Sequence, residues 1–200
     1  MLIGLTGKSG SGKTYASAYF KKLGAYVIDC DRAAHNALTF PSVKEKIKNT
    51  FGEAVFTKSE VDRKKLGRIV FSDPKLLKKL NEIVHPEVTD FILSETESLR
   101  DQICIIDGSE LEESGIDEKC KFVIVICADE KIRLERIIKR DSIAPLDAQR
   151  RIDAQKDYSK KALLIENNST RAEFEKKLGD VYSFLRMHLN EKDNCFNSGI

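Results

Sequence analysis

The sequence has almost no excess of charge. Its 34 lysines and arginines nearly balance 32 aspartates and glutamates, which leaves a formal net charge of +2 over 200 residues. Proteins that bind nucleic acid or membrane surfaces in general carry a larger and clustered basic excess. The charge balance therefore predicts no nucleic-acid partner and no membrane partner, and any anion-binding site must be local.

The cysteines lack the spacing of a metal site. The sequence contains no C-x-x-C pair and no histidine at zinc spacing from a cysteine, so we expect no structural zinc. Several of the five cysteines lie in apolar runs, where a free thiol acts as a small core residue in a reducing compartment. Long apolar runs are lacking too, and no signal peptide opens the sequence. These absences predict a cytoplasmic protein.

What the sequence does contain is an alternation of short apolar runs and helical stretches. Apolar runs of this length, separated by helices such as residues 14–23, are typical of a parallel sheet buried on both faces. With 41% hydrophobic residues, the chain is long enough to form one α/β domain with its own core. The runs are residues 2–5, 26–28, 103–106, 122–126 and 163–165.

The connection over residues 29–102 is too long for a simple crossover between strands. We therefore expect a mostly helical lobe at about residues 32–100, which would bind the substrate. The single predicted domain spans residues 1–190. The polar residues 191–200 are predicted to form a flexible tail.

A second helical region is predicted near the end of the domain. Residues 129–141 have a strongly charged helical pattern, and Pro145 suits the first turn of another helix that runs toward Tyr158. The two helices are expected to form a lid at about residues 129–158.

One segment carries a complete phosphate-binding motif. Residues 7–14 read G-K-S-G-S-G-K-T, which fits G-x-x-x-x-G-K-[ST] and stands between a predicted strand and a predicted helix. Lys13 is expected to bridge the β- and γ-phosphates of ATP, and Thr14 to supply a hydroxyl ligand for Mg²⁺. The expected ATP contacts are Gly10, Ser11, Gly12, Lys13, Thr14 and Tyr15.

Two carboxylates, Asp29 and Asp31, follow the second apolar run. They stand at the carboxyl edge of the predicted sheet, where open α/β folds bind their ligands. One of them would accept the proton of the acceptor hydroxyl while the other reaches Mg²⁺ through water. The alternative is that Asp31 only caps a helix that begins at Arg32.

Asp107 follows the third apolar run, as a Walker B carboxylate does. This position predicts a role at the magnesium ion. The alternative is an ordinary turn residue, because turns favour aspartate.

Three arginines of the lid, Arg133, Arg136 and Arg140, fall on one helical face. Neither Arg136 nor Arg140 has a carboxylate three or four residues away. An uncompensated arginine row favours an anionic ligand, here the triphosphate of ATP, which Arg136 and Arg140 would grip as the lid closes. The alternative is a solvated basic face.

Further motifs follow the phosphate-binding loop in a fixed order. They are V-I-D-C-D at residues 27–31, Asp62-Arg63, Leu80-Asn81, His85-Pro86, Glu113-Ser114-Gly115, Arg136 with Arg140-Asp141, Arg151-Ile152 with Gln155, and I-E-N-N at residues 165–168. In this order and spacing, over nearly the whole chain up to about residue 190, the sequence resembles the dephospho-CoA kinase family.

The resemblance implies a P-loop NTPase fold of the nucleotide-kinase type. This fold has three layers around a five-stranded parallel sheet, with a helical CoA-binding lobe and an arginine-bearing lid. The implied reaction is transfer of the γ-phosphoryl group of ATP, with Mg²⁺, to the ribose 3′-hydroxyl of dephospho-CoA. It yields coenzyme A and is the last step of its synthesis.

The resemblance also assigns roles to single residues. It implies that Asp31 is the base for the 3′-hydroxyl, with Asp29 close by. It makes Arg63, His85 and Glu113 acceptor-site candidates. The residues alone favour a simpler reading of His85, as a turn residue before a proline.

The sequence departs from the family pattern after Asp107. Residues 108–113 read G-S-E-L-E-E where the family usually has V-P-L-L-F-E, so a normally apolar wall becomes acidic. This change puts the acceptor contacts of the loop in question. Lys8 also stands where a second glycine is common, and Arg133 lies near a position that is often glutamine.

Three alternatives remain open at this point. The first is another P-loop kinase that acts on a nucleoside, a nucleotide or a sugar acid. The second is a GTPase-like switch, which would need N-K-x-D after a strand, whereas residues 127–130 read C-A-D-E. The third is a degenerate member that binds CoA or nucleotide without catalysis.

Overall fold

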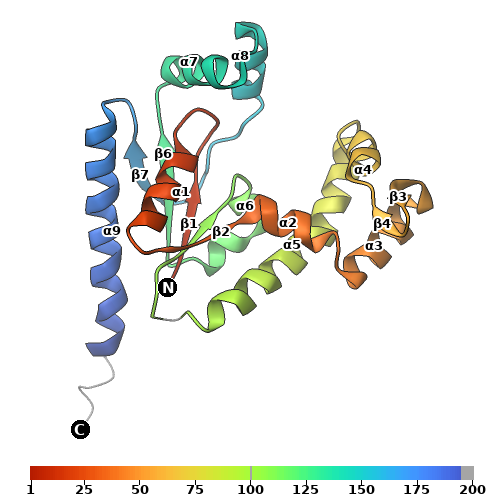
Figure 1. Ribbon diagram of the computed structural model, residues 1–200, viewed down its shortest axis with the longest axis horizontal. Coiled ribbons are helices and arrows are strands. Elements are labelled where there is room, and N and C mark those ends of the chain that lie inside the picture. Colours follow the sequence, from red (N-terminus) through yellow and green to blue (C-terminus); the bar gives the residue numbers. More distant parts are fainter. Residues whose placement is uncertain (100, 195–200) are drawn as a thin grey trace. The chain divides into compact units, whose positions relative to one another are not determined.

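The computed structural model describes residues 1–99 and 101–194. Within this part the chain forms two compact units (Figure 1). The first comprises Met1–Ile28 together with the described residues from Leu99 onward, and the second comprises Asp29–Ser98. The two units are described separately below.

A five-stranded sheet with the order β2-β5-β1-β6-β7 organises the first unit. Strand β1 pairs in parallel with β5 and β6, and β6 pairs in parallel with β7. Leu5 aligns with Asp107 of β5 and with Ile124 of β6, so the loop after β1 starts beside the end of β5. The predicted α/β class with five parallel strands is confirmed. The strands are β1 (Leu2–Thr6), β2 (Tyr26–Asp29), β5 (Cys104–Asp107), β6 (Phe122–Cys127) and β7 (Leu163–Glu166).

Two helices of the first unit, α1 and α7, lie close to where the sequence predicts helices. Helix α1 starts one residue before the predicted range, and Gly24, with φ of 102°, supplies the expected left-handed residue after it. Helix α7 matches the charged pattern predicted over residues 129–141. The helices are α1 (Lys13–Lys22), α6 (Leu111–Ser114), the 3-10 helix η2 (Ile116–Lys119), α7 (Glu130–Asp141), α8 (Pro145–Asp153) and α9 (Arg171–Asn194).

Helix α8 ends at Asp153, earlier than the predicted end near Tyr158. Residues 155–160, which we call the return segment, lead back toward β7 without regular structure. The backbone N–H of Ser159 donates to the Glu112 carboxylate at 2.9 Å, so it is not available for a helical carbonyl. This contact holds the return segment in a non-helical path.

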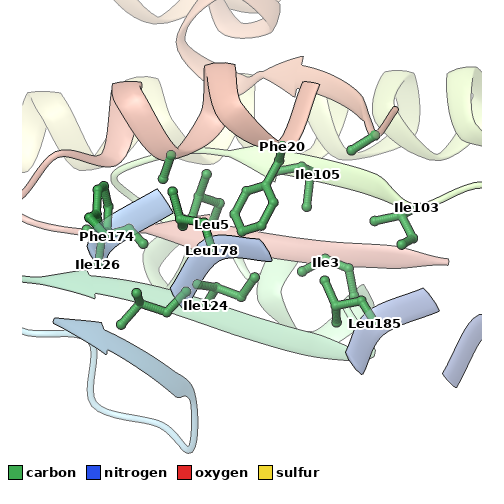
Figure 2. Packing of buried hydrophobic residues seen from close by; sticks show 13 residues of the cluster. Ile3, Leu5, Phe20, Ile103, Ile105, Ile124, Ile126, Phe174, Leu178 and Leu185 are labelled. Atoms are coloured by element: carbon green, nitrogen blue, oxygen red, sulfur yellow. The ribbon is translucent and has the colours of Figure 1, made fainter. Parts of the chain in front are cut away.

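The core of the first unit holds the loop between β1 and α1 in place. Figure 2 shows Phe20 of α1 with Leu178 and Leu185 of α9 against the side chains of the sheet. All three are fully buried, as are Ile3 and Leu5 of β1. Burial of one such side chain stabilises a fold by about 1.5–3 kcal/mol. The beginning of α1 is thereby fixed on rigid elements.

The second unit is mostly helical, as predicted. Helices α2, α3 and α4 pack against α5. The sequence did not predict the short hairpin of β3 and β4, because its turn residues, Lys58 and Ser59, adopt positive φ without being glycine or asparagine. The elements are α2 (Cys30–Ala37), α3 (Pro41–Phe51), the 3-10 helix η1 (Glu53–Val55), β3 (Phe56–Thr57), β4 (Glu60–Val61), α4 (Arg63–Val70) and α5 (Pro74–Glu97).

His85 does not lie in a turn. It and Pro86 are inside helix α5, so the turn interpretation of His85 is wrong. An internal proline costs about 3 kcal/mol or more, because it removes a hydrogen bond and clashes with the preceding turn. Burial of Val84, Val88 and Ile92 on the same helix offsets this cost.

The predicted tail begins later than expected. Residues 191–194 continue helix α9, since each added residue extends the hydrogen-bond ladder, and residues 195–200 lie outside the described residues. None of the helices in the described ranges is both long enough and apolar enough to cross a membrane.

Candidate active site

The phosphate-binding loop lies between β1 and α1, and Gly10 and Gly12 are two of the positions where its backbone needs glycine. Gly10 and Gly12 have φ of 81° and 103°, in the left-handed region. A Cβ atom on Gly10 would lie 2.6 Å from the carbonyl oxygen of Arg133, and one on Gly12 would collide with the side-chain amide of Asn167. Close packing from α7 and from the residue after β7 therefore shapes the loop.

Three consecutive carbonyl groups of the loop accept hydrogen bonds from side chains outside it. The Ser9 carbonyl accepts from Arg133 Nε at 3.0 Å. The next two carbonyls, of Gly10 and Ser11, accept from Arg136 Nη1 at 3.2 Å and from Asn167 Nδ2 at 2.7 Å. The outer side of the loop is thus satisfied by fixed donors.

The outward N–H groups of the loop also have partners. The Ser9 N–H donates to Gln155 Oε1 at 2.7 Å, and the Ser11 N–H donates to the Lys8 carbonyl at 3.0 Å. Lys8 itself forms an ion pair with Asp157 of the return segment, with 2.6 Å between Nζ and Oδ1. Neither Gln155 nor Asn167 was among the predicted site residues, although both lie in motifs that the family resemblance covers.

Lys13 and Asp107 meet at the start of α1. Their side chains form an ion pair, and both are largely withdrawn from solvent, at 20% and 14% exposure. Thr14 follows Lys13 in the first turn of the helix and is exposed. The structure therefore brings together the lysine of the loop and the carboxylate at the end of β5, two residues that the sequence placed at one site.

Each of the three arginines of α7 has a partner in this structure, but among the described residues only Arg140 is paired with a carboxylate. Arg133 is 7% exposed and binds the loop backbone, and Arg136 joins the loop to the Asn167 carbonyl, at 3.0 Å from Nη2. Arg140 forms a two-point ion pair with Asp141, at 2.7 and 2.8 Å. A search at helical spacings of three and four misses this partner because it is the adjacent residue.

The Arg140–Asp141 pair changes the titration of both groups. The hydrogen bonds from Arg140 hold the pKa of the Asp141 carboxyl below its ordinary value, and the carboxylate raises the pKa of Arg140. Arg151 of α8 also contacts Asp141. The cation of Arg140 is therefore shared with an acidic neighbour and is not free in this state.

Tyr15, a predicted ATP contact, is held by helix α9. Its hydroxyl is hydrogen-bonded to Glu175 and accepts from Arg171 Nε at 2.7 Å. The Arg171 guanidinium also lies over the Tyr15 ring, 4.9 Å from its centroid. The hydrogen bond to Glu175 raises the pKa of the tyrosine, so its hydroxyl stays protonated at neutral pH.

The return segment is anchored to the loop region after β5. Asp117 is 5% exposed, accepts from the Tyr158 hydroxyl at 2.9 Å and forms an ion pair with Lys160 at 2.7 Å. Burial and this hydrogen bond raise the pKa of Tyr158. Glu112 binds both the backbone N–H and the hydroxyl of Ser159. Glu113, the predicted acceptor contact beside it, is exposed.

In the second unit, Asp29 and Asp31 have different positions. Helix α2 begins at Cys30, and Asp29 caps it, since its Oδ1 accepts from the Arg32 N–H at 3.0 Å. The interpretation of Asp31 as the cap is therefore wrong, because Asp31 lies inside the first turn. Its carboxylate takes no part in this cap.

Arg63, the predicted acceptor contact at the start of α4, contacts His35 of α2. The distance between Arg63 Nη2 and His35 Nε2 is 2.6 Å. A guanidinium group can only donate, so Nε2 of His35 is the acceptor in this contact. Sequence reasoning did not single out His35. Only its position one turn after Asp31 offered a signal.

Comparisons with known proteins give a family for this chain. A family model described as dephospho-CoA kinase matches residues 1–173. A dephospho-CoA kinase from Fusobacterium nucleatum is 40% identical over 89% of this chain and 95% of its own. A Thermus thermophilus crystal structure has a TM-score of 0.76 at 30% identity, covering 92% of this chain and 97% of that one. The dephospho-CoA kinase structure from Campylobacter jejuni has a TM-score of 0.68 at 25% identity, covering 94% and 98%. With a complete phosphate-binding loop and a match over most of its length, this chain belongs to the dephospho-CoA kinase family.

Proposed function

We propose that this protein transfers the γ-phosphoryl group of ATP to the ribose 3′-hydroxyl of dephospho-CoA. The pairing of Lys13 with Asp107 at the start of α1 is the observation that carries this proposal. A lysine that already rests beside a carboxylate can exchange that partner for the β- and γ-phosphates when ATP binds. Family membership supplies the acceptor.

The phosphates would bind to backbone N–H groups of the loop and of the first turn of α1. Gly10, Gly12, Lys13 and Thr14 provide these groups, and the helix dipole adds to their attraction for an anion. Arg136 and Arg140 would contact the triphosphate only after leaving the partners that they have here. We therefore assign Lys13 the first contact and the two arginines a role on closure of the lid, residues 129–158.

The residues present fit Mg²⁺. Thr14 offers a hydroxyl and Asp107 a carboxylate, both oxygen ligands, and Mg²⁺ in phosphoryl-transfer sites takes one or two such groups with phosphate oxygens and water. Within the described ranges no cluster of three or more histidine, cysteine, aspartate or glutamate residues forms a metal cage. When bound, Mg²⁺ would offset the charge that develops on the phosphates.

We assign Asp31 as the group that accepts the proton of the 3′-hydroxyl. The hydroxyl oxygen then forms a bond to the γ-phosphorus, the bond from that phosphorus to the bridging oxygen breaks, and ADP leaves. Asp29 caps α2 with one carboxylate oxygen, which favours Asp31 for proton transfer. Arg63, His85 and Glu113 are assigned to acceptor binding, with Asp29–Ser98 as the acceptor lobe.

A reducing compartment suits the protein. Cys30, Cys104, Cys120 and Cys127 are free thiols. We therefore propose a cytoplasmic location.

The test is a coupled assay with ATP, Mg²⁺ and a panel of acceptors that includes dephospho-CoA, a nucleoside, a nucleotide and a sugar acid. We expect turnover of dephospho-CoA, and Lys13→Ala should lower the rate at least about a hundredfold, as loss of one preorganised charge-stabilising group does. Turnover of another acceptor without turnover of dephospho-CoA would refute the proposal.

A further inference from the structure

The side chain of Arg133 is a buried cation, and a contribution to the stability of the fold does not explain why it is buried. It is 7% exposed, it makes one hydrogen bond through Nε to the Ser9 carbonyl, and within the described residues its Nη2 has no partner. A buried charge with an unsatisfied donor is costly, and an apolar side chain of similar volume is often neutral or stabilising at such a site. A function at the loop accounts for its presence.

The bond to Ser9 fixes more than one carbonyl. In a planar trans peptide, the C=O of one residue and the N–H of the next point in opposite directions. A Ser9 carbonyl directed at Arg133 therefore turns the Gly10 N–H to the other side of the peptide. Backbone N–H groups are what such a loop offers to phosphate.

The peptide between Ser9 and Gly10 precedes a glycine, so a tether restricts a peptide that could otherwise rotate. Glycine has no Cβ and takes either sign of φ at little cost, so rotation of this peptide would present a carbonyl oxygen to the anion. The N–H of Ser9 is held as well, by Gln155. The two tethers come from the two ends of the lid, α7 and the return segment.

We propose that Arg133 is a positioning residue for the phosphate-binding loop, which acts by holding the Ser9 carbonyl away from ATP and the Gly10 N–H toward it. The proposal rests on the proposed ATP-dependent function, but it concerns the loop alone. It assigns Arg133 no direct contact with the nucleotide. Arg140 has a different proposed role, because it would contact the triphosphate itself. In this structure its guanidinium is paired with Asp141 and not with a carbonyl of the loop.

Two substitutions separate the donor atom from the charge. Glutamine places its amide nitrogen at the same point along the side chain as the arginine Nε, so Arg133→Gln keeps a donor for the Ser9 carbonyl and loses the charge. Methionine places a methyl group there, so Arg133→Met loses both. Arg150→Gln is the matched control, because this arginine is 70% exposed and pairs only with Asp147 among the described residues.

The first measurement is binding of inorganic tripolyphosphate with Mg²⁺, by calorimetry. We expect Arg133→Met to bind about tenfold more weakly than the parent, the size expected for the loss of one hydrogen bond, and Arg133→Gln and Arg150→Gln to stay within about threefold. In turnover assays, the KM for ATP should rise in Arg133→Met while the KM for dephospho-CoA does not. Amide hydrogen exchange should increase over residues 8–13 in this variant and not in Arg133→Gln.

Equal binding by parent and Arg133→Met would overturn the proposal. Equal losses in both Arg133 variants would overturn it too, because the charge and not the donor would then matter. If circular dichroism shows Arg133→Met to be unfolded, Arg133→Gln alone tests the proposal. Tripolyphosphate affinity that is retained in Arg133→Gln supports the role of the hydrogen-bond donor, and a tenfold loss of affinity refutes it. Tripolyphosphate binding needs no acceptor, so a parent that binds it without phosphorylating dephospho-CoA refutes the proposed function and leaves this comparison intact.

Discussion

Glu112 accepts two hydrogen bonds from Ser159, one from the backbone N–H at 2.9 Å and one from the hydroxyl. The pair joins the loop after β5 to the return segment. It lies in the acidic stretch of residues 108–113, where the family usually has apolar residues. One acid of this stretch is thus engaged in holding the return segment.

The first prediction concerns the charge of Glu112. The Ser159 hydroxyl, and then its N–H, hold the pKa of this carboxyl below its ordinary value of 4.5. A lowered folded-state pKa means that the ionised form stabilises the fold above the unfolded-state pKa, and that this stabilisation is lost as pH falls through the folded-state value. Glu112→Gln should therefore be less stable than the parent between pH 7 and 5, and the gap should close below pH 4.5. Urea unfolding at a series of pH values measures this difference in the free energy of unfolding.

Glu113→Gln is the control for this series, because Glu113 is the exposed neighbour of Glu112. Its difference from the parent should be small at every pH. A gap for Glu112→Gln that does not change between pH 7 and 3.5 would contradict the role given to the carboxylate charge.

The second prediction concerns Asp107 and magnesium. Asp107→Asn keeps the shape of the side chain but removes the charge that pairs with Lys13 and would attract Mg²⁺. We expect turnover to fall about a hundredfold and the Mg²⁺ concentration for half-maximal activity to rise. Titration of Mg²⁺ at fixed ATP measures both.

The control is Asp180→Asn, a change at an exposed position of α9, which should behave as the parent does. An unchanged Mg²⁺ dependence in Asp107→Asn would show that Asp107 is not part of the metal site.

The strands and the loop were predictable because their signals are local. Each strand is an apolar run of a few residues, and the phosphate-binding loop needs glycine where the backbone turns with positive φ, as at Gly10 and Gly12. Such constraints act on residues that are neighbours in the sequence. They can therefore be recognised from the sequence alone.

The partners of the lid arginines were not predictable, because they are tertiary. Arg133 binds Ser9, which is 124 residues away in the sequence, and nothing in the charge pattern of α7 indicates a backbone carbonyl as its partner. The non-helical path of the return segment has the same kind of cause, since the Glu112 carboxylate accepts from the N–H of Ser159 across 47 residues. Helical periodicity predicts which residues share one face of a helix, but it does not predict which parts of the protein that face contacts.

The third prediction separates Asp29 from Asp31. Asparagine caps a helix as well as aspartate does, so Asp29→Asn should keep helix α2 and most of the activity. Asp31→Asn should keep ATP affinity while turnover falls about 10²- to 10⁴-fold, the usual contribution of a general base. Rate measurements at saturating substrate, together with ATP binding, distinguish the two. The reverse ranking would exchange the roles of the two aspartates.

The last prediction concerns Cys120. Burial, and to a lesser degree the negative charge of Asp117, raises the pKa of its thiol from 9.0 to about 12. Because only the thiolate reacts with iodoacetamide, a thiol with this pKa is ionised at about one part in 10⁴ at pH 8, about a thousandfold less than an unperturbed thiol. Alkylation of Cys120 in the folded protein should therefore be slower by about that factor than in guanidinium-unfolded protein, as measured by mass spectrometry of its peptide.

Asp117→Asn should speed the reaction, because it removes the neighbouring charge. The alkylation rate should still stay below that of the unfolded protein, since burial is the larger cause of the raised pKa. Equal rates in the folded parent and the unfolded chain would show that the thiol is not withdrawn from solvent, and that the anchor formed around Asp117 is open in solution.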